Sequence, residues 1–296
     1  MGDKQATSSG AGEQAALWNG PTGQAWVAHQ ALLDRMLQPM EALLAGAVDA
    51  GTAQHLLDVG CGAGATTLAL ARLTGARGHC TGIDISGPLV DVARSRAQRE
   101  GVPATFVHAD AQAHAFAPGS FDAIVSRLGV MFFTDPVAAF ANLRRAAKPG
   151  AALRCIAWRS AADNPFMTTA ERAAAPLLPN LPPRQPGGPG QFAFGDRQLV
   201  RSILEDSGWT AIDITPVDVA CALPAHALED YFTSLGPVGL ALRDADAGTR
   251  AQVVEVVGNA FRPYVQGETV PFTAACWMIT ARAPAGPEAE HTTEHG

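Results

Sequence analysis

The sequence predicts an α/β fold, a doubly wound sheet whose strands are mainly parallel. Two features carry this prediction: five apolar segments alternate with helical segments between residues 55 and 158, and the first apolar segment ends in a glycine-rich turn. A content of 47% hydrophobic and 17% charged residues is typical of a globular chain rather than a disordered one. At 296 residues, the chain could form two domains or one elaborated domain.

The strands and helices of the first half have recognisable ends. Ser86 and Asp135 are residue types that cap helix N-termini, and a proline follows each of them in the first turn. Gly75 and Gly101 end the two helices that precede them. The predicted strands are 55–59, 80–85, 105–109, 121–126 and 152–158, and the predicted helices are 63–73, 86–100 and 135–148.

The second half is less regular. Residues 161–195 are dense in proline and glycine and predict a cap loop. A helix at 197–206, a strand at 211–220, a helical insertion at 222–270 and a last strand at 272–281 complete the sheet within 196–282. The ends are expected to be a disordered leader at 1–15, before N-terminal lid helices at 16–50, and a disordered tail at 283–296.

Charge and cysteine content exclude several classes of protein. The net charge is −7 and no Lys/Arg block occurs, which argues against a nucleic-acid partner. No apolar run is long enough for a membrane span. The five cysteines form no CxxC motif and no zinc-binding spacing. We therefore expect reduced thiols, a cytoplasmic location and no metal, whereas the oligomeric state is not predicted.

The most informative motif is the turn that contains Gly60, Gly62 and Gly64. It follows the first strand and leads into a helix, and glycines allow a backbone to approach a ligand closely. The motif alone is ambiguous, because Gly60-x-Gly62-x-x-Ala65 also satisfies the dinucleotide-binding pattern. A carboxylate at Asp84, the end of the second strand, suits any ligand with a ribose.

Three further features favour a ligand other than a dinucleotide. Asp58 precedes the turn where the NAD-binding pattern usually has an apolar residue, and Asp110 follows the third strand, where it could accept from an adenine amine. The turn also has no Arg or Lys near it in sequence, which suits a cationic ligand better than a pyrophosphate.

Together these segments resemble the motifs of class I S-adenosylmethionine (SAM)-dependent methyltransferases, in the small-molecule branch related to the ubiquinone/menaquinone methyltransferase type. LLDVGCGAGATTLALA is similar to the first motif, GIDIS to the second and FVHADAQ to the third, while FDAIVSRLGVMFFTDP and KPGAALRCIAW are similar to the fourth and fifth. The resemblance implies a Rossmann-like seven-stranded sheet in which strands one to five are parallel and the last is antiparallel. It also implies SAM as cofactor and an enzyme of the EC 2.1.1 type.

The resemblance also implies roles for individual residues. The glycine turn would wrap the methionine half of SAM, Asp84 would hold the ribose, and Asp110 with Ala111 would meet the adenine edge. Asp58 and Asp110 could instead be turn or cap residues, and Trp18 and Trp26 could simply pack the lid onto the sheet. The residues implied to bind the cofactor are Asp58, Gly60, Gly62, Gly64, Asp84, Ile85, Asp110, Ala111, Ser126, Trp26 and Gln30.

The acceptor site is less well defined by the sequence. Catalytic candidates are Arg127, Trp158 and Asn164, and substrate-binding candidates are Trp18, Met131, Phe132, Phe192, Phe194 and Gly236. Arg127 could hold a carboxylate or carbonyl of a substrate, or form a structural ion pair. The resemblance implies methyl transfer by in-line displacement, and no acid–base pair can be identified from the sequence. Because the cap has few charges, we expect the acceptor to be a small, largely apolar metabolite. The acceptor atom is not predicted.

Two other functions remain open at this stage. One is a NAD(P)-dependent oxidoreductase, although both tyrosines, Tyr231 and Tyr264, lie late in the chain with no lysine near them. The other is a catalytically silent SAM-binding regulatory protein, against which the intact glycine turn argues.

Overall fold

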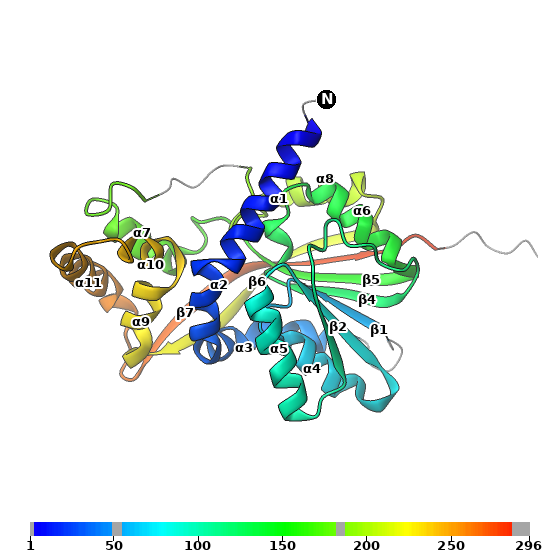
Figure 1. Ribbon diagram of the computed structural model, residues 1–296, viewed down its shortest axis with the longest axis horizontal. Helices are drawn as coiled ribbons and strands as arrows, with labels where there is room; N and C mark the ends of the chain where they lie inside the picture. Colours follow the sequence, from blue (N-terminus) through cyan, green and yellow to red (C-terminus); the bar gives the residue numbers. More distant parts are fainter. Residues whose placement is uncertain (1–2, 49–54, 182–186, 286–296) are drawn as a thin grey trace, which may run out of the picture.

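The computed structural model describes residues 3–48, 55–181 and 187–285. A twisted seven-stranded sheet crosses the molecule, with helices on both faces (Figure 1). The strand order is β3-β2-β1-β4-β5-β7-β6. The strands are β1 (His55–Val59), β2 (His79–Asp84), β3 (Ala104–His108), β4 (Phe121–Arg127), β5 (Ala147–Trp158), β6 (Thr210–Pro224) and β7 (Thr269–Arg282).

The strand directions confirm the predicted architecture. Strands β1 to β5 pair in parallel, and β7 runs antiparallel to both of its neighbours, β5 and β6. Strand β1 is buried along most of its length, as a strand covered on both faces must be. The strand order reverses beside β1, between β2 and β4, and the crevice at the carboxyl ends there is where open α/β sheets bind ligands.

The helices form two layers and an N-terminal cover. Helices α3, α4 and α5 pack on one face of the sheet, and α6 and α8 pack on the other (Figure 1). The α-helices are α1 (Asp3–Asn19), α2 (Pro21–Ala28), α3 (Gln30–Gly46), α4 (Ala65–Thr74), α5 (Gly87–Glu100), α6 (Pro136–Ala146), α7 (Pro165–Ala174), α8 (Arg197–Asp206), α9 (Leu228–Ser234), α10 (Gly236–Leu242) and α11 (Ala247–Phe261).

Two sequence expectations differ from the structure. Residues 1–15 were expected to be disordered, but helix α1 begins at Asp3. Its C-terminal turns reach tertiary partners that a local pattern does not reveal, since Gln14 and Trp18 face the cavity described below. The expected cap loop at 161–195 contains helix α7, which begins at Pro165 before the proline-rich stretch. The expected tail lies mostly outside the described residues.

The predicted helix caps also behave differently. Asp135 caps α6, because its side chain accepts a hydrogen bond from the Ala138 N–H at 2.9 Å. Ser86 makes no such bond to α5; its hydroxyl donates to the carbonyl of Trp18 at 2.7 Å. The Ser86 side chain therefore joins the N-terminal segment to the sheet.

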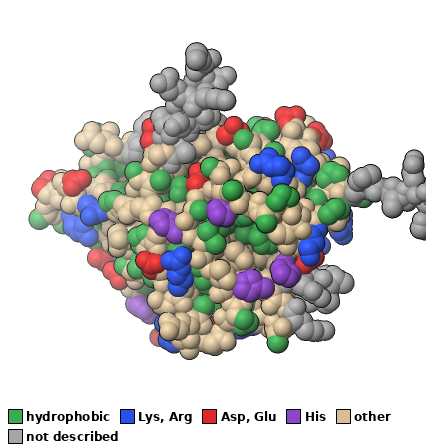
Figure 2. All heavy atoms as spheres, turned by 45° about the vertical axis from the view of Figure 1, so that its right-hand side comes forward, with side chains coloured by type: hydrophobic (Ala, Val, Ile, Leu, Met, Phe, Trp, Pro, Cys, Tyr) green, Lys and Arg blue, Asp and Glu red, His purple; other side chains and the backbone are tan. Residues whose placement is uncertain are grey.

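Acidic and basic side chains are interspersed on the face in Figure 2, with no extended basic area of the kind that binds nucleic-acid phosphates. Among the described helices, none has the length and apolar character needed to cross a membrane. All five cysteines are buried free thiols, and the described residues contain no cluster of three potential metal ligands.

Candidate functional site

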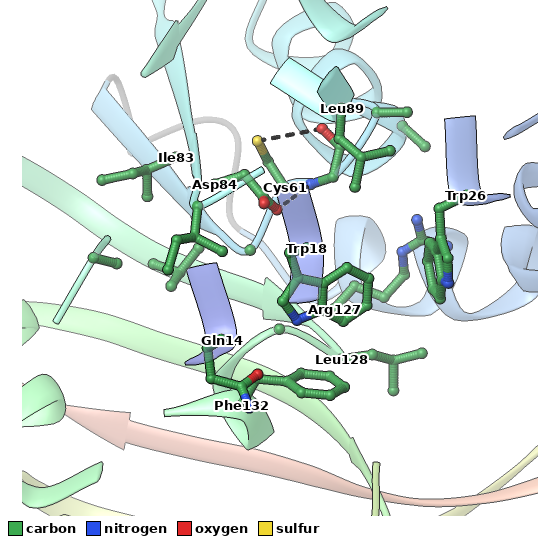
Figure 3. A pocket seen from close by; sticks show the side chains of 18 of the residues that line it. Gln14, Trp18, Trp26, Cys61, Ile83, Asp84, Leu89, Arg127, Leu128 and Phe132 are labelled. Carbon is green, nitrogen blue, oxygen red and sulfur yellow. Dashed lines mark hydrogen bonds between the residues drawn. The ribbon is translucent and has the colours of Figure 1, made fainter. Parts of the chain in front are cut away.

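A cavity opens at the carboxyl ends of β1, β2 and β4, beneath the N-terminal helices. It encloses about 1080 Å³, the open solvent at its mouth included. In Figure 3, Cys61 and Asp84 lie above Trp18, Leu128 and Phe132. The sequence-predicted residues that line the cavity are Trp18, Trp26, Gln30, Gly60, Gly62, Asp84, Ile85, Asp110, Ala111, Arg127 and Phe132.

The glycines of the turn serve different purposes. All three have left-handed backbones, with φ of 68° at Gly60, 53° at Gly62 and 84° at Gly64. A Cβ on Gly60 would lie 2.6 Å from Cα of Gly129, and one on Gly64 would lie 2.9 Å from Cβ of Ala93. A Cβ on Gly62 would meet nothing within 4 Å. Gly60 and Gly64 thus allow close packing, whereas Gly62 leaves space in the cavity.

Asp84 ties the end of β2 to this turn. One of its carboxylate oxygens accepts from the Gly62 N–H at 2.7 Å, and the other accepts from the Ser86 N–H at 2.8 Å. Burial raises the pKa of Asp84, and the backbone hydrogen bonds oppose that rise. Each oxygen keeps a further lone pair, so the carboxylate can accept from two hydroxyls of a ligand in the cavity.

A second carboxylate, Asp110, lies after β3. It accepts from the backbone N–H of Gln112 at 2.9 Å and from that residue's side-chain amide at 3.2 Å. The side-chain oxygen of Gln112, Oε1, in turn accepts from the backbone N–H groups of Thr134 and Asp135. Gln112 therefore links Asp110 to the loop after β4, a role that its sequence position did not reveal.

Aromatic side chains cover the mouth of the cavity. The rings of Trp18 and Trp26 meet edge to face with centroids 5.5 Å apart, and Trp18 meets Phe132 in the same way at 5.2 Å. Trp18 and Trp26 belong to helices α1 and α2, whereas Phe132 follows β4. Contacts between aromatic side chains that line the cavity therefore join the N-terminal helices to the segment after β4.

A polar contact fastens the same helices to the loop after β2. The Asn19 side chain donates to the Ile85 carbonyl at 2.9 Å and accepts from the Gly87 N–H at 2.8 Å. With the bond from Ser86 to Trp18, three hydrogen bonds join the end of α1 to the loop that Asp84 organises. Asn19 was not a sequence candidate, because a lone asparagine after a polar segment carries no distinctive pattern.

The turn has a basic neighbour that the local sequence did not indicate. Arg96 of helix α5 donates to the Ala63 carbonyl at 2.7 Å and forms an ion pair with Asp34 of α3 at 2.7 Å. Gln30 also donates to Asp34. An arginine therefore lies beside the turn in the fold although none is near it in sequence, but Arg96 is paired with Asp34 and does not line the cavity.

Three predicted cofactor residues lie behind the cavity wall. Asp58 is buried and accepts from the Thr67 hydroxyl at 2.6 Å, and its other oxygen has no partner. Ser126 is buried and donates to the Val59 carbonyl at 2.7 Å. Gly64 packs against helix α5. These residues hold the turn and the strand ends in place and do not face the cavity.

Asp58 should make stability depend on pH. Burial raises the pKa of its carboxyl to about 6, although the Thr67 hydrogen bond opposes the rise. Because the folded protein binds this proton more tightly than the unfolded chain, this contribution to stability is present at low pH and is lost as pH rises from about 4 to about 6.

Substitution of Asp58 by asparagine tests this. The variant keeps an acceptor for Thr67 and no longer titrates. The free energy of unfolding of the variant minus that of the unchanged protein should be about 2 kcal/mol larger at pH 7.5 than at pH 4.5. Denaturant unfolding at both pH values measures this difference, and an unchanged difference would contradict the burial-raised pKa.

Several substrate and catalytic candidates lie away from the cavity. Trp158 and Met131 are buried, and the Met131 sulfur contacts the Trp158 N–H at 3.3 Å. Phe194 is buried and stacks on Phe140. Phe192 packs beside this core, and Gly236 begins helix α10 with a left-handed backbone. None of these five residues lines the cavity, because each belongs to the core or to the helical insertion.

Asn164, a catalytic candidate, does not line the cavity and is hydrogen-bonded to β7. It is fully buried, and its side-chain amide donates to the Ala275 carbonyl and accepts from the Ala275 N–H, each at 2.9 Å. Asn164→Ala should lower the free energy of unfolding by about 2–4 kcal/mol, since both backbone groups of Ala275 lose a partner. Denaturant unfolding measures this, with Asn259→Ala, an exposed site on α11, as control. A loss below about 1 kcal/mol would contradict it.

Arg127 ends β4 and lines the cavity. One terminal nitrogen donates to the Leu37 carbonyl at 3.3 Å, and the buried Nε has no partner. No carboxylate among the described residues forms an ion pair with it. Burial raises the pKa of Glu41 on α3, and the positive charge of Arg127 opposes this rise. The expected alternative of a structural ion pair is therefore not present in the described part of the chain.

Comparison with known proteins gives this cavity a context. A family model described as a methyltransferase domain matches residues 57–155, which run from β1 to β5. An uncharacterised protein of Mycobacterium tuberculosis is 29% identical over 213 residues, covering 70% of this chain and 73% of that protein. A demethylmenaquinone methyltransferase of Staphylococcus aureus is 36% identical over 101 residues, covering 34% of this chain and 41% of that enzyme.

Solved structures share the fold at lower identity. The crystal structure of a putative methyltransferase from Bacillus halodurans superposes with a TM-score of 0.54 at 14% identity, covering 83% of this chain and 99% of that one. The region matched by the family model includes β1, β2 and β4, whose carboxyl ends line the cavity.

Proposed function

The chain is a member of the class I SAM-dependent methyltransferases, and we propose that it transfers the methyl group of SAM to a small, largely apolar metabolite bound in the cavity beneath α1–α3. One observation carries the proposal: a single cavity joins the glycine turn and Asp84 to an aromatic cover. The family indicates the enzyme class. We propose the roles of the individual residues and the chemical class of the acceptor.

The residues present fit SAM. Gly62 leaves open the space that a Cβ would fill, and Asp84, which lines the cavity, keeps acceptor capacity for two ribose hydroxyls. Ile85 and Ala111 offer apolar surface, and Asp110 offers an acceptor for an adenine amine. When bound there, SAM supplies an electrophilic methyl group that needs no further activation.

The contribution of the protein is then alignment and exclusion of water. Trp18, Trp26 and Phe132 form a connected aromatic cover, and Asn19 fastens it to the loop after β2. Holding two reactants in line within a closed cavity accounts for several kcal/mol of a displacement barrier. The cavity lining also includes Leu33, Leu37, Leu128, Phe132 and Phe133, and this apolar surface supports a largely apolar acceptor.

Ligand-dependent thermal unfolding tests the proposed cofactor site. SAM and its demethylated product S-adenosylhomocysteine (SAH), each at 100 times its dissociation constant, should add about 2.7 kcal/mol and raise the unfolding temperature by several degrees. NAD and NADP should cause no shift. A shift with a nicotinamide cofactor, or none with SAM and SAH, would contradict the proposal.

A further inference from the structure

We infer that the methyl acceptor carries an anionic oxygen group and that the guanidinium of Arg127 binds it. The inference rests on the proposed function and specifies its substrate class: a small apolar acid that reaches the enzyme already ionised. The reasons are the position of Arg127, its missing partners and the absence of a suitable base in the cavity.

The position of Arg127 separates it from the proposed adenosine site. Asp84 ends β2 and Asp110 follows β3, while Arg127 ends β4, two strands from β2 and three from β3. At about 4.8 Å between strands, these offsets are about 10 Å and 14 Å across the sheet. Arg127 therefore lies in the other half of the cavity, beside Leu37 of α3 and next to Leu128.

The hydrogen-bonding capacity of Arg127 is mostly unused. A guanidinium has five N–H donors. Among the described residues, Arg127 donates one long bond, to the Leu37 carbonyl, and its buried Nε has no partner. Arg96, which lies beside the glycine turn, differs in this respect, because it forms an ion pair with Asp34 and a hydrogen bond to the Ala63 carbonyl. A partly buried cation with an unbonded Nε and no ion pair among the described residues is costly, and a planar oxyanion ligand would reduce that cost.

The acid–base groups of the cavity lead to the same class of acceptor. The described lining contains no His, Lys or Tyr. Its carboxylates are engaged, Asp34 by Arg96 and Gln30, Asp84 by backbone N–H groups and Asp110 by Gln112. Burial raises the pKa of the Cys61 thiol, which keeps it neutral. An acceptor that must lose a proton finds no suitable base, so one that is ionised in solution fits best.

The charge of Arg127 then distinguishes an anion from an amine. An amine acceptor is an ammonium in water, and the guanidinium would repel it, whereas it attracts an acid. The apolar neighbours Trp18, Trp26 and Leu128 provide contact area for a hydrocarbon or aromatic body. The acceptor half of the cavity thus matches an apolar body that carries one anionic oxygen group.

Binding of a matched pair of probes tests the inference. The full chain saturated with SAH is titrated by calorimetry with 1-naphthoate and with 1-naphthamide, which share a ring and differ in charge. The variants are Arg127→Gln and Arg127→Met, which remove the charge, and Arg201→Gln, a control on α8 outside the cavity. Thermal unfolding without ligand confirms that each variant is folded.

The expected result is at least tenfold tighter binding of naphthoate than of naphthamide to the unchanged protein and to Arg201→Gln. The preference should fall to threefold or less in a folded neutral variant of Arg127. Equal binding of the two probes, no naphthoate binding, or a preference that survives in the neutral variant would overturn the inference.

A separate titration with SAH distinguishes the two proposals. SAH affinity in the neutral Arg127 variants should stay within threefold of the unchanged protein. A loss of tenfold or more would show that Arg127 binds the carboxylate of the cofactor, which overturns the inference and leaves the proposed function standing. Failure of SAH to bind the unchanged protein would contradict the proposed function itself.

Discussion

Replacement of Asp84 by alanine should lower the affinity for SAM by at least about 100-fold while the protein still folds. Two hydrogen bonds from ribose hydroxyls to a carboxylate are worth about 1.5–3 kcal/mol each, and 1.4 kcal/mol corresponds to a factor of ten. The substitution also removes the acceptor of the Gly62 and Ser86 N–H groups. Gly62 lines the cavity, where water can replace the carboxylate.

Calorimetric titration with SAM measures this loss, and thermal unfolding without ligand checks the fold. Asp84→Asn, which keeps the shape of the side chain but not its charge, should lose affinity by a smaller factor. Asp91→Asn on α5 is the control, because that carboxylate is exposed and pairs with Arg94 outside the cavity. An Asp84→Ala affinity within threefold of the unchanged protein would contradict the role assigned to Asp84.

The second large effect concerns Gly62. Gly62→Ala should reduce SAM affinity by at least about tenfold, because its Cβ would project into space that the ligand needs. The backbone strain of an alanine with φ of 53° should cost about 1–2 kcal/mol of stability. Gly101→Ala is a matched control: its φ is 63°, a Cβ there also meets nothing within 4 Å, and it ends α5 away from the cavity.

Both variants should therefore lose similar stability, and only Gly62→Ala should lose affinity. Denaturant unfolding and SAM titration give the two quantities. Equal SAM affinities for the two variants would show that position 62 requires glycine only for its left-handed backbone conformation and that the ligand does not approach it.

The sheet could be predicted because its strands and turns are local patterns. The strand–helix alternation from His55 to Trp158 and the glycine turn required no knowledge of distant contacts. The cavity residues after β1, β2 and β3 followed from the same regularity, since the carboxyl ends of parallel strands share one edge. Asp84 and Asp110 could therefore be placed at that edge.

The remainder depends on contacts between distant segments. Trp158 ends β5 and Asn164 follows it, so both were predicted to be site residues. The cavity opens beside β4, however, and Asn164 is hydrogen-bonded to β7. Asn19, Asp34 and Arg96 belong to helices whose faces become partners only after folding. The contact of Arg96 with the glycine turn could not be predicted from residue spacing, and the formation of α1 could not be predicted from local helix propensity.

The most direct test is a crystal structure of the protein with SAH bound. The account predicts both ribose hydroxyls of SAH within hydrogen-bonding distance of the Asp84 carboxylate, the adenine edge at Asp110, and the homocysteine portion along Gly60–Gly62. SAH bound elsewhere, or bound in the cavity without contact between its ribose and Asp84, would contradict the account.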